Sequence, residues 1–198
     1  MNKEVKTIGI LCSGGDSPGM NAAIRAATRT ALFHGHRMIG IKRGYSGLLS
    51  NEFQELTLSS VGNILQRGGT FLQTSRCPEF MEKSARRQAA DNLIKQSIAS
   101  LIVIGGDGSF NGAHLLSTET KTPVIGIPGT IDNDISGTQY TIGYDTAVRN
   151  AIEAVDRIRE TASSHARTFL IEVMGRNSSA IAQKVGLCTG AENIILPH

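Results

Sequence analysis

The chain has 198 residues, of which 40% are apolar, and a formal net charge of +3. This length allows one large domain, or one domain with part of another. The mild charge gives no reason to expect nucleic acid binding, and no apolar run reaches the roughly 20 residues that a membrane helix needs. Cys12, Cys77 and Cys188 show no metal-ligand spacing and the N-terminus does not resemble a signal peptide, so we expect a cytoplasmic protein that binds no membrane.

The first predicted unit is a strand, a glycine-rich turn and a helix. Val5–Leu11 reads as a buried strand, and a helix is expected from about Met20 to Phe33. The turn between them has neither the P-loop nor the Rossmann spacing, so it is a phosphate-binding candidate of another type, in which Gly15 lets a phosphate approach the backbone. Arg25 and Arg29 share one face of the helix. A solvated basic stripe explains these two arginines as well as an anion site does.

The next stretch is expected to contain short elements and one notable arginine. We predict a strand, a loop, a short strand, a short helix and an amphipathic helix, in that order, at Arg37–Lys42, Arg43–Gly47, Gln54–Leu58, Ser60–Gln66 and Ser84–Gln96. Arg76 stands in a loop just before Pro78, where it is a candidate phosphate clamp. Taken alone, such an arginine is more often an ordinary surface residue.

The run from Leu101 to Asp134 is the centre of the sequence. Two apolar runs, Leu101–Ile104 and Val124–Ile127, fit fully buried parallel strands, and a connecting helix is expected at Asn111–Leu116. A strand–helix–strand unit of this kind delivers both following turns to one carboxyl edge of the sheet, where open α/β folds bind ligands.

The two turns of this central run differ in chemistry. In Gly105–Ser109 the glycines allow phosphates to reach backbone N–H groups, and Asp107 suits a hard cation such as Mg²⁺. In Thr130–Asp134 two carboxylates, Asp132 and Asp134, stand two residues apart, so that one could accept a proton from an attacking hydroxyl. Either turn alone would usually be ordinary turn chemistry, but their pairing at consecutive strand ends favours a site.

The remaining chain predicts a second group of elements. We expect a helix, a strand, a turn ending in an arginine, a helix and a strand, at Thr146–Thr161, Thr168–Val173, Met174–Arg176, Ser178–Leu187 and Asn193–Leu196. The alternation predicts an α/β fold, a doubly wound and mostly parallel sheet with helices on both faces, followed by the start of a second, smaller α/β domain. We place the two domains at residues 1–141 and 142–198.

Six motifs occur together in order and spacing: SGGDSPGMNAAIR, RGGTFLQTSR, VIGGDGS, PGTIDND, SSHAR and EVMGR. This ordered set resembles the bacterial type of the 6-phosphofructokinase family over the whole chain. The resemblance implies transfer of the γ-phosphoryl group of ATP to the 1-hydroxyl of fructose 6-phosphate, a glycolytic step, with residues 1–141 binding ATP and residues 142–198 forming the first part of the sugar-phosphate domain.

The resemblance also implies roles for individual residues. ATP would be held by Gly15, Arg76, Cys77, Gly106, Asp107, Gly108 and Ser109. Asp107 would hold Mg²⁺. Asp132 would be the general base, supported by Thr130 and Asp134, with Arg176 as the fourth catalytic residue. The sugar phosphate would be bound by Thr130, Ile131, Asp132, Arg167, Met174, Gly175 and Arg176.

Assembly and regulation are further implications of the resemblance. Arg167 would reach the site of a neighbouring subunit, usually in a homotetramer. An ADP or phosphoenolpyruvate effector would contact Arg25, Arg29, Arg159, Gly190, Ala191 and Glu192. Leu58 and Asn63 replace an arginine and an aspartate that the family often uses at that site, which predicts weakened or altered effector control. Family chains run to roughly 320 residues, so we expect this one to be a truncated, N-terminal portion.

The donor and the class of protein leave alternatives open. Pyrophosphate-using relatives carry Asp and Lys at the positions of Gly108 and Gly129, so the glycines favour ATP, with a pyrophosphate-dependent enzyme as the alternative. A NAD or diacylglycerol kinase would share the GGDG turn but not PGTIDND followed by MGR. A truncated, non-catalytic subunit that binds nucleotide or sugar phosphate is the remaining alternative.

Overall fold

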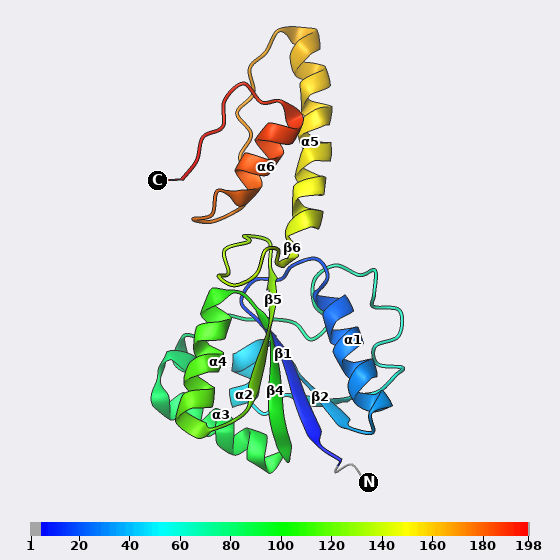
Figure 1. The fold of residues 1–198 in the computed structure, drawn as a ribbon, viewed down its shortest axis with the longest axis vertical. Coiled ribbons are helices and arrows are strands. Elements are labelled where there is room, and N and C mark those ends of the chain that lie inside the picture. Colours follow the sequence, from blue (N-terminus) through cyan, green and yellow to red (C-terminus); the bar gives the residue numbers. More distant parts are fainter. Residues whose placement is uncertain (1–4, 198) are drawn as a thin grey trace. The chain divides into compact units, whose positions relative to one another are not determined.

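Short apolar, β-branched runs form the strands of a single sheet, and residues 5–197 are described by the computed structural model (Figure 1). The strands are β1 (Thr7–Ser13), β2 (Arg37–Ile41), β3 (Phe53–Leu56), β4 (Ile98–Gly105), β5 (Val124–Thr130) and β6 (Ile142–Gly143). Their order across the sheet is β3-β2-β1-β4-β5-β6. The pairs β1–β2, β1–β4 and β4–β5 are parallel and β2–β3 is antiparallel, so the expected mostly parallel α/β sheet is confirmed.

The helices connect and cover these strands. They are α1 (Met20–Phe33), α2 (Gly44–Leu49), α3 (Lys83–Lys95), α4 (Asp107–Thr120), α5 (Tyr144–His165) and α6 (Ala180–Thr189), with one 3₁₀ turn, η1 (Pro78–Met81). Among the residues described, no helix is both long enough and apolar enough to cross a bilayer.

Each face of the sheet has its own core, as a doubly wound fold requires. On one face Ile10 and Ile104 pack against Met20 and Ile24 of α1. On the other face Leu11, Val103 and their neighbours pack against α2, α3 and α4, which lie on the opposite side of the strands from α1 (Figure 1). The expectation of helices on both faces is therefore confirmed.

By the contacts between its residues the chain separates into two units, Met1–Gly129 and Thr130–His198. In the second unit, α5 packs against α6 through a small core that contains Tyr144, Val148, Val155, Ile181 and Val185. The domain division at residue 141 and the ligands assigned to each domain stay predictions.

Two predicted strands of the second unit are wrong. Thr168–Val173 and Asn193–Leu196 have no strand structure, and Leu170 is 86% exposed. A strand needs a hydrogen-bonded neighbour, and the described residues of this unit pair neither segment in a ladder. Both segments instead line a hollow of about 870 Å³ beside α5 and α6.

Smaller corrections concern the first unit. The expected loop at residues 43–47 is the start of α2, and the expected helix at residues 60–66 is a series of turns. The connecting helix extends beyond Asn111–Leu116 at both ends, to Asp107–Thr120. The local sequence predicts the type and the ends of these elements poorly, because both depend on which residues the element packs against.

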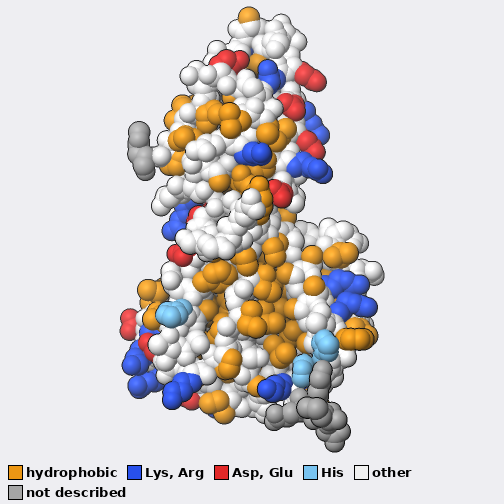
Figure 2. Space-filling view, viewed as in Figure 1, with side chains coloured by type: hydrophobic (Ala, Val, Ile, Leu, Met, Phe, Trp, Pro, Cys, Tyr) orange, Lys and Arg blue, Asp and Glu red, His pale blue; other side chains and the backbone are white. Residues whose placement is uncertain are grey.

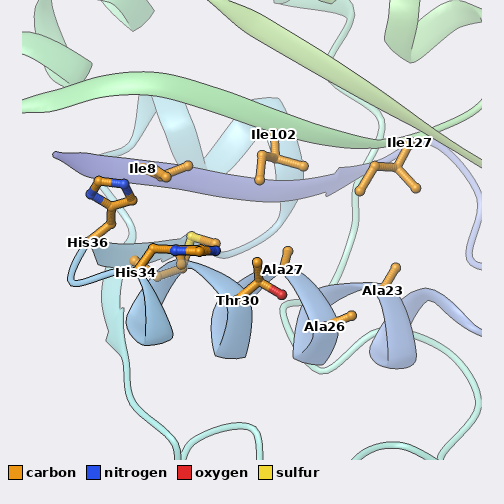
Figure 3. A pocket seen from close by; sticks show the side chains of 11 residues that line it. Ile8, Ala23, Ala26, Ala27, Thr30, His34, His36, Ile102 and Ile127 are labelled. Carbon is orange, nitrogen blue, oxygen red and sulfur yellow. The ribbon is translucent and has the colours of Figure 1, made fainter. Parts of the chain in front are cut away.

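The prediction that Val124–Ile127 is fully buried is also wrong, since Ile125 is 66% exposed. One face of β5 is covered, because a Cβ on Gly126 would lie 2.8 Å from the Phe110 ring of α4. The other face opens onto an apolar groove of about 440 Å³, in which Ile8, Ile102 and Ile127 face the small side chains of α1 (Figure 3). Figure 2 shows hydrophobic side chains gathered over the strands of this unit.

Candidate active site

The sheet reverses its winding direction between β1 and β4, and two of the predicted turns follow these strands. Ser13 and Gly105, the last residues of the two strands, are paired across the parallel ladder. The chain leaves β1 toward α1 on one face and leaves β4 toward α4 on the other. A crevice outside the carboxyl ends of strands at such a reversal is where open α/β sheets bind ligands.

The two turns are in direct contact. Ser109 Oγ donates a hydrogen bond to the Ser13 carbonyl at 2.9 Å, and a Cβ added to Gly105 would lie 2.5 Å from that same carbonyl oxygen. Glycine at position 105 is therefore required by the packing of one turn against the other.

Gly15 and Gly108 present a different environment. A Cβ on either residue would meet no heavy atom within 4 Å. The protein's own packing therefore does not require glycine at these two positions. Without side chains there, the backbone N–H groups of the turn after β1 and of the start of α4 are accessible to an anion. At Gly129, by contrast, a Cβ would lie 2.9 Å from Ile104, so core packing alone explains that glycine.

The first turn of α4 carries the predicted metal ligand. Asp107 is exposed, and its Oδ2 accepts a hydrogen bond from Asn111 Nδ2 at 3.1 Å. Within the described part of the chain no three His, Cys, Asp or Glu side chains cluster as a metal cage would. One exposed carboxylate fits the way proteins hold Mg²⁺, which takes one or two carboxylates while phosphate oxygens and water complete its octahedron.

Arg76 and Cys77 lie at the end of an irregular segment that is bound to the β1 turn. Thr74 Oγ1 donates to the Gly14 carbonyl at 2.8 Å, two residues before the exposed Arg76. Cys77 is partly buried, which raises the pKa of its thiol. The first unit thus brings the predicted ATP residues to one edge of its sheet.

The carboxylate loop of the second unit is organised by Asn133. This residue has a left-handed backbone (φ 50°), and its Oδ1 accepts a hydrogen bond from the Thr141 N–H at 2.9 Å. Thr141 Oγ1 donates to the Thr130 carbonyl at 2.7 Å, and Thr130 Oγ1 accepts from the Asp132 N–H at 3.2 Å. These bonds close the loop so that Asp132 and Asp134 stand on a fixed turn.

The surroundings of Asp132 favour its protonated form more than water would. Partial burial is the main cause that raises the pKa of its carboxyl, and the charge of Asp134 raises this pKa further, while Arg176 lowers it. These opposing influences show that Asp132, Asp134 and Arg176 interact electrostatically. A carboxylate with a raised pKa is a better proton acceptor.

The turn that carries Arg176 requires glycine at its centre. Gly175 has φ 150°, and a Cβ there would lie 2.6 Å from the Ser178 carbonyl oxygen. The Ser178 N–H donates to the Gly175 carbonyl at 2.8 Å and closes the turn. Met174 and Arg176, on either side of Gly175, are exposed. Ile131 of the carboxylate loop and Val173, which precedes this turn, pack against the same core of the second unit.

The predicted effector residues fall in both units. Arg29 is exposed on α1, and Arg25 Nη1 donates to the Val61 carbonyl at 2.6 Å. In the second unit Arg159 donates to the Thr189 carbonyl, and Gly190 ends α6 in a left-handed conformation beside exposed Ala191 and Glu192. Arg167, predicted to reach a neighbouring subunit, is exposed just after α5 and lines the same hollow as Arg159 and Glu192.

Sequence reasoning missed four residues that shape these turns: Asn21, Tyr45, Asn133 and Thr141. Tyr45 is buried, stacks on Phe80 at 3.9 Å between ring centroids, and donates from its hydroxyl to the Ser109 carbonyl at 2.6 Å. Asn133 lay inside a motif already singled out, and an asparagine in an acidic turn is a signal for a left-handed residue. Asn21 also lies inside a quoted motif, but its partners and that of Tyr45 are 46 to 64 residues away, so neither role has a local signal. The partners of Thr141 are 8 and 11 residues away, across an irregular loop.

Comparison with known proteins gives one consistent answer. The sequence pattern of the family described as Phosphofructokinase matches residues 7–198. ATP-dependent 6-phosphofructokinases from Thermoanaerobacter sp. (strain X514) and Aquifex aeolicus are 60% and 57% identical to this chain over 194 and 191 residues. The matches cover 98% and 96% of this chain but 60% of each relative, so the chain spans about three fifths of their length.

Solved structures agree with these relatives. Phosphofructokinase from Saccharomyces cerevisiae is 41% identical, with a TM-score of 0.91 over 94% of this chain and 28% of that one. A pyrophosphate-dependent phosphofructokinase from Marinobacter aquaeolei, at 22% identity and a TM-score of 0.80 over 92% of this chain and 49% of that one, shows the shared fold alone. The turns, their order along the chain and these similarities together establish that the chain belongs to the phosphofructokinase family.

Proposed function

We propose that this chain carries the nucleotide-binding and part of the sugar-phosphate-binding machinery of an ATP-dependent 6-phosphofructokinase. The reaction is transfer of the γ-phosphoryl group of ATP to the 1-hydroxyl of D-fructose 6-phosphate, giving fructose 1,6-bisphosphate and ADP. The observation that carries the proposal is the 60% identity to a relative with this activity, supported by the open glycines beside Asp107 and the raised pKa of Asp132.

ATP is held at the edge of the first unit. Backbone N–H groups at Gly15 and Gly106–Ser109 bind phosphate oxygens, and Arg76 and Cys77 complete the nucleotide site. Asp107 would hold Mg²⁺, which when bound neutralises charge on the phosphates. Gly108 faces open space, and a carboxylate at that position would repel the α-phosphate, so the geometry supports ATP rather than pyrophosphate as the donor.

The second unit supplies the proton acceptor. As the oxygen of the 1-hydroxyl forms its bond to the γ-phosphorus, the bond from that phosphorus to the bridging oxygen of ADP breaks, and Asp132 takes the hydroxyl proton. Thr130 holds the Asp132 loop, Asp134 supports Asp132 by raising the pKa of its carboxyl, and Arg176 places positive charge near the migrating group. Ile131, Met174 and Gly175 contact the sugar phosphate beside them.

Assembly and regulation complete the proposal. A homotetramer in the cytoplasm would let Arg167 reach a neighbouring subunit's substrate. An ADP or phosphoenolpyruvate effector would contact Arg25, Arg29, Arg159 and residues 190–192, with control altered by Leu58 and Asn63. Exposure of the Arg29, Arg159 and Arg167 side chains supports these roles.

The direct test is a coupled assay with fructose 6-phosphate and either ATP–Mg²⁺ or pyrophosphate as donor. We expect turnover with ATP that is lost in Asp132→Asn. Turnover with pyrophosphate and none with ATP would contradict the proposed donor. Calorimetric titration with each ligand distinguishes an active enzyme from a chain that binds both substrates without turnover. This second outcome has to be tested because the chain spans only three fifths of the length of its relatives.

A further inference from the structure

The segment from Arg67 to Arg76 has neither helix nor strand structure, yet it is bound by the Asn21 side chain of α1 and by a backbone carbonyl of the turn after β1. Asn21, in the first turn of α1, is 2% exposed. Its Nδ2 donates to the Arg67 carbonyl at 3.0 Å and to the Gly68 carbonyl at 3.2 Å, and its Oδ1 accepts from the Phe71 N–H at 2.8 Å. One buried amide thus satisfies three backbone groups of a segment almost 50 residues further along the chain.

The same segment is held again immediately before Arg76. Thr74 Oγ1 donates to the Gly14 carbonyl at 2.8 Å, and Ser75 Oγ donates to the Arg43 carbonyl at 2.8 Å. The Arg43 N–H in turn donates to the Leu72 carbonyl at 2.9 Å. Because residues 67–76 have no regular hydrogen-bond ladder, these bonds determine the position of the backbone at Arg76.

Helix capping does not explain Asn21. Gly19 is the N-cap residue of α1, and no side chain caps that helix. The side-chain amide of Asn21 donates to and accepts from backbone groups of the 67–71 segment instead. A buried amide that binds only another segment serves to place that segment.

We propose that Asn21 is a positioning residue for phosphoryl transfer, which sets the place of Arg76 beside the glycine turns, with Thr74 as the second tether. This inference rests on the proposed function. Asn21 touches no reacting atom. It acts through the 67–76 segment, so its loss affects nucleotide binding more than the folding of the whole unit.

The experiment compares Asn21→Ala, Thr74→Val and Thr74→Ser with a matched control, Thr120→Val. Thr120 Oγ1 also donates to a backbone carbonyl, that of Leu116 at 2.6 Å, but at the far end of α4. Hydrogen exchange of peptides covering residues 67–77 and calorimetric titration with ATP–Mg²⁺ are measured on each protein. Where turnover is present, KM for ATP is measured separately from kcat.

We expect faster exchange confined to the 67–77 peptides in Asn21→Ala and Thr74→Val, and roughly tenfold weaker ATP binding, which is the size expected for the loss of one or two hydrogen bonds. Thr74→Ser keeps the hydroxyl and should bind ATP as the unaltered chain does, and so should Thr120→Val.

Unchanged exchange and ATP affinity in a folded Asn21→Ala protein would overturn the inference. If that variant does not fold, equal ATP affinity in Thr74→Val and Thr74→Ser would overturn it as well. Failure of the unaltered chain to bind ATP would count against the proposed function, whereas the exchange of the 67–77 peptides reports separately on whether Asn21 places this segment.

Discussion

At the scale of single residues, the environment of Asp132 sets how the proposed reaction depends on pH. The carboxyl must be deprotonated to accept a proton, so the rate falls as the pH drops through its pKa. Burial and the charge of Asp134 raise that pKa, and Arg176 lowers it. The two neighbours should therefore move the acidic limb of the pH profile in opposite directions when each is replaced.

We predict that Asp134→Asn moves the acidic limb of kcat/KM to lower pH, because it removes a charge that raises the pKa of Asp132. Arg176→Met should move this limb to higher pH, at a lower overall rate. The measurement is kcat/KM for fructose 6-phosphate from pH 5 to 8.5. A limb that stays in place in both variants would show that Asp132 is not the titrating base.

A second residue-scale prediction concerns Thr28 in α1. Its side chain is fully buried, and its Oγ1 has no hydrogen-bond partner among the described residues. Thr28→Val removes this unpaired hydroxyl, so we expect stabilisation by about 1 kcal/mol, seen as a melting point about 2–4 °C higher.

Thr189→Val is the matched control for Thr28→Val. Thr189 is equally a buried helical threonine, but its hydroxyl donates to the Val185 carbonyl at 2.9 Å. This control should be neutral or destabilising. A lower melting point for Thr28→Val would mean that the hydroxyl has a partner in solution.

At the scale of elements, α4 is fastened at both of its ends. Near its start the Tyr45 hydroxyl donates to the Ser109 carbonyl, and Tyr45 stacks on Phe80 of η1. Near its end Glu119 accepts two hydrogen bonds from Arg86 at 2.8 Å, and Arg86 also donates to the Phe80 carbonyl. The 3₁₀ turn that follows Arg76 and Cys77 is thus joined to the helix that carries Asp107.

We predict that Tyr45→Phe costs about 1 kcal/mol of stability through the lost hydrogen bond. It should also speed hydrogen exchange in the first turn of α4 and weaken ATP binding. Tyr144→Phe is the control, because its hydroxyl bonds the Ala180 carbonyl at 3.2 Å in the other unit. Equal effects of both changes on ATP affinity would show that the Tyr45 bond has no special part in placing the turn.

At the scale of the whole molecule, the first unit leaves an apolar face of its sheet open. Ile8, Ile102 and Ile127 line the groove beside α1 (Figure 3). Ile125, two residues before Ile127 on β5, is 66% exposed. Open apolar surface of this kind favours association between copies.

We predict that Ile125→Lys lowers self-association at high protein concentration while the melting point changes little, since substitution of an exposed side chain is usually worth within about 0.5 kcal/mol. Light scattering coupled to size-exclusion chromatography measures the association. Ile94→Lys is the control, because Ile94 is 73% exposed on α3, which packs against the other face of the sheet. Equal effects of the two substitutions would argue against the open face of β5 as the associating surface.

The sequence by itself determined the doubly wound sheet of the first unit, the turns after β1 and β4, and the family. It could do so because each signal is local: a buried β-branched run needs only its own residues to be recognised, and a glycine turn only its own spacing. Only the tertiary structure decided which side chains hold those turns, since Asn21, Tyr45 and Thr74 bind carbonyls 46 to 64 residues away. It also decided that residues 168–173 and 193–196 form no strands, because a strand exists only where a neighbour pairs with its backbone.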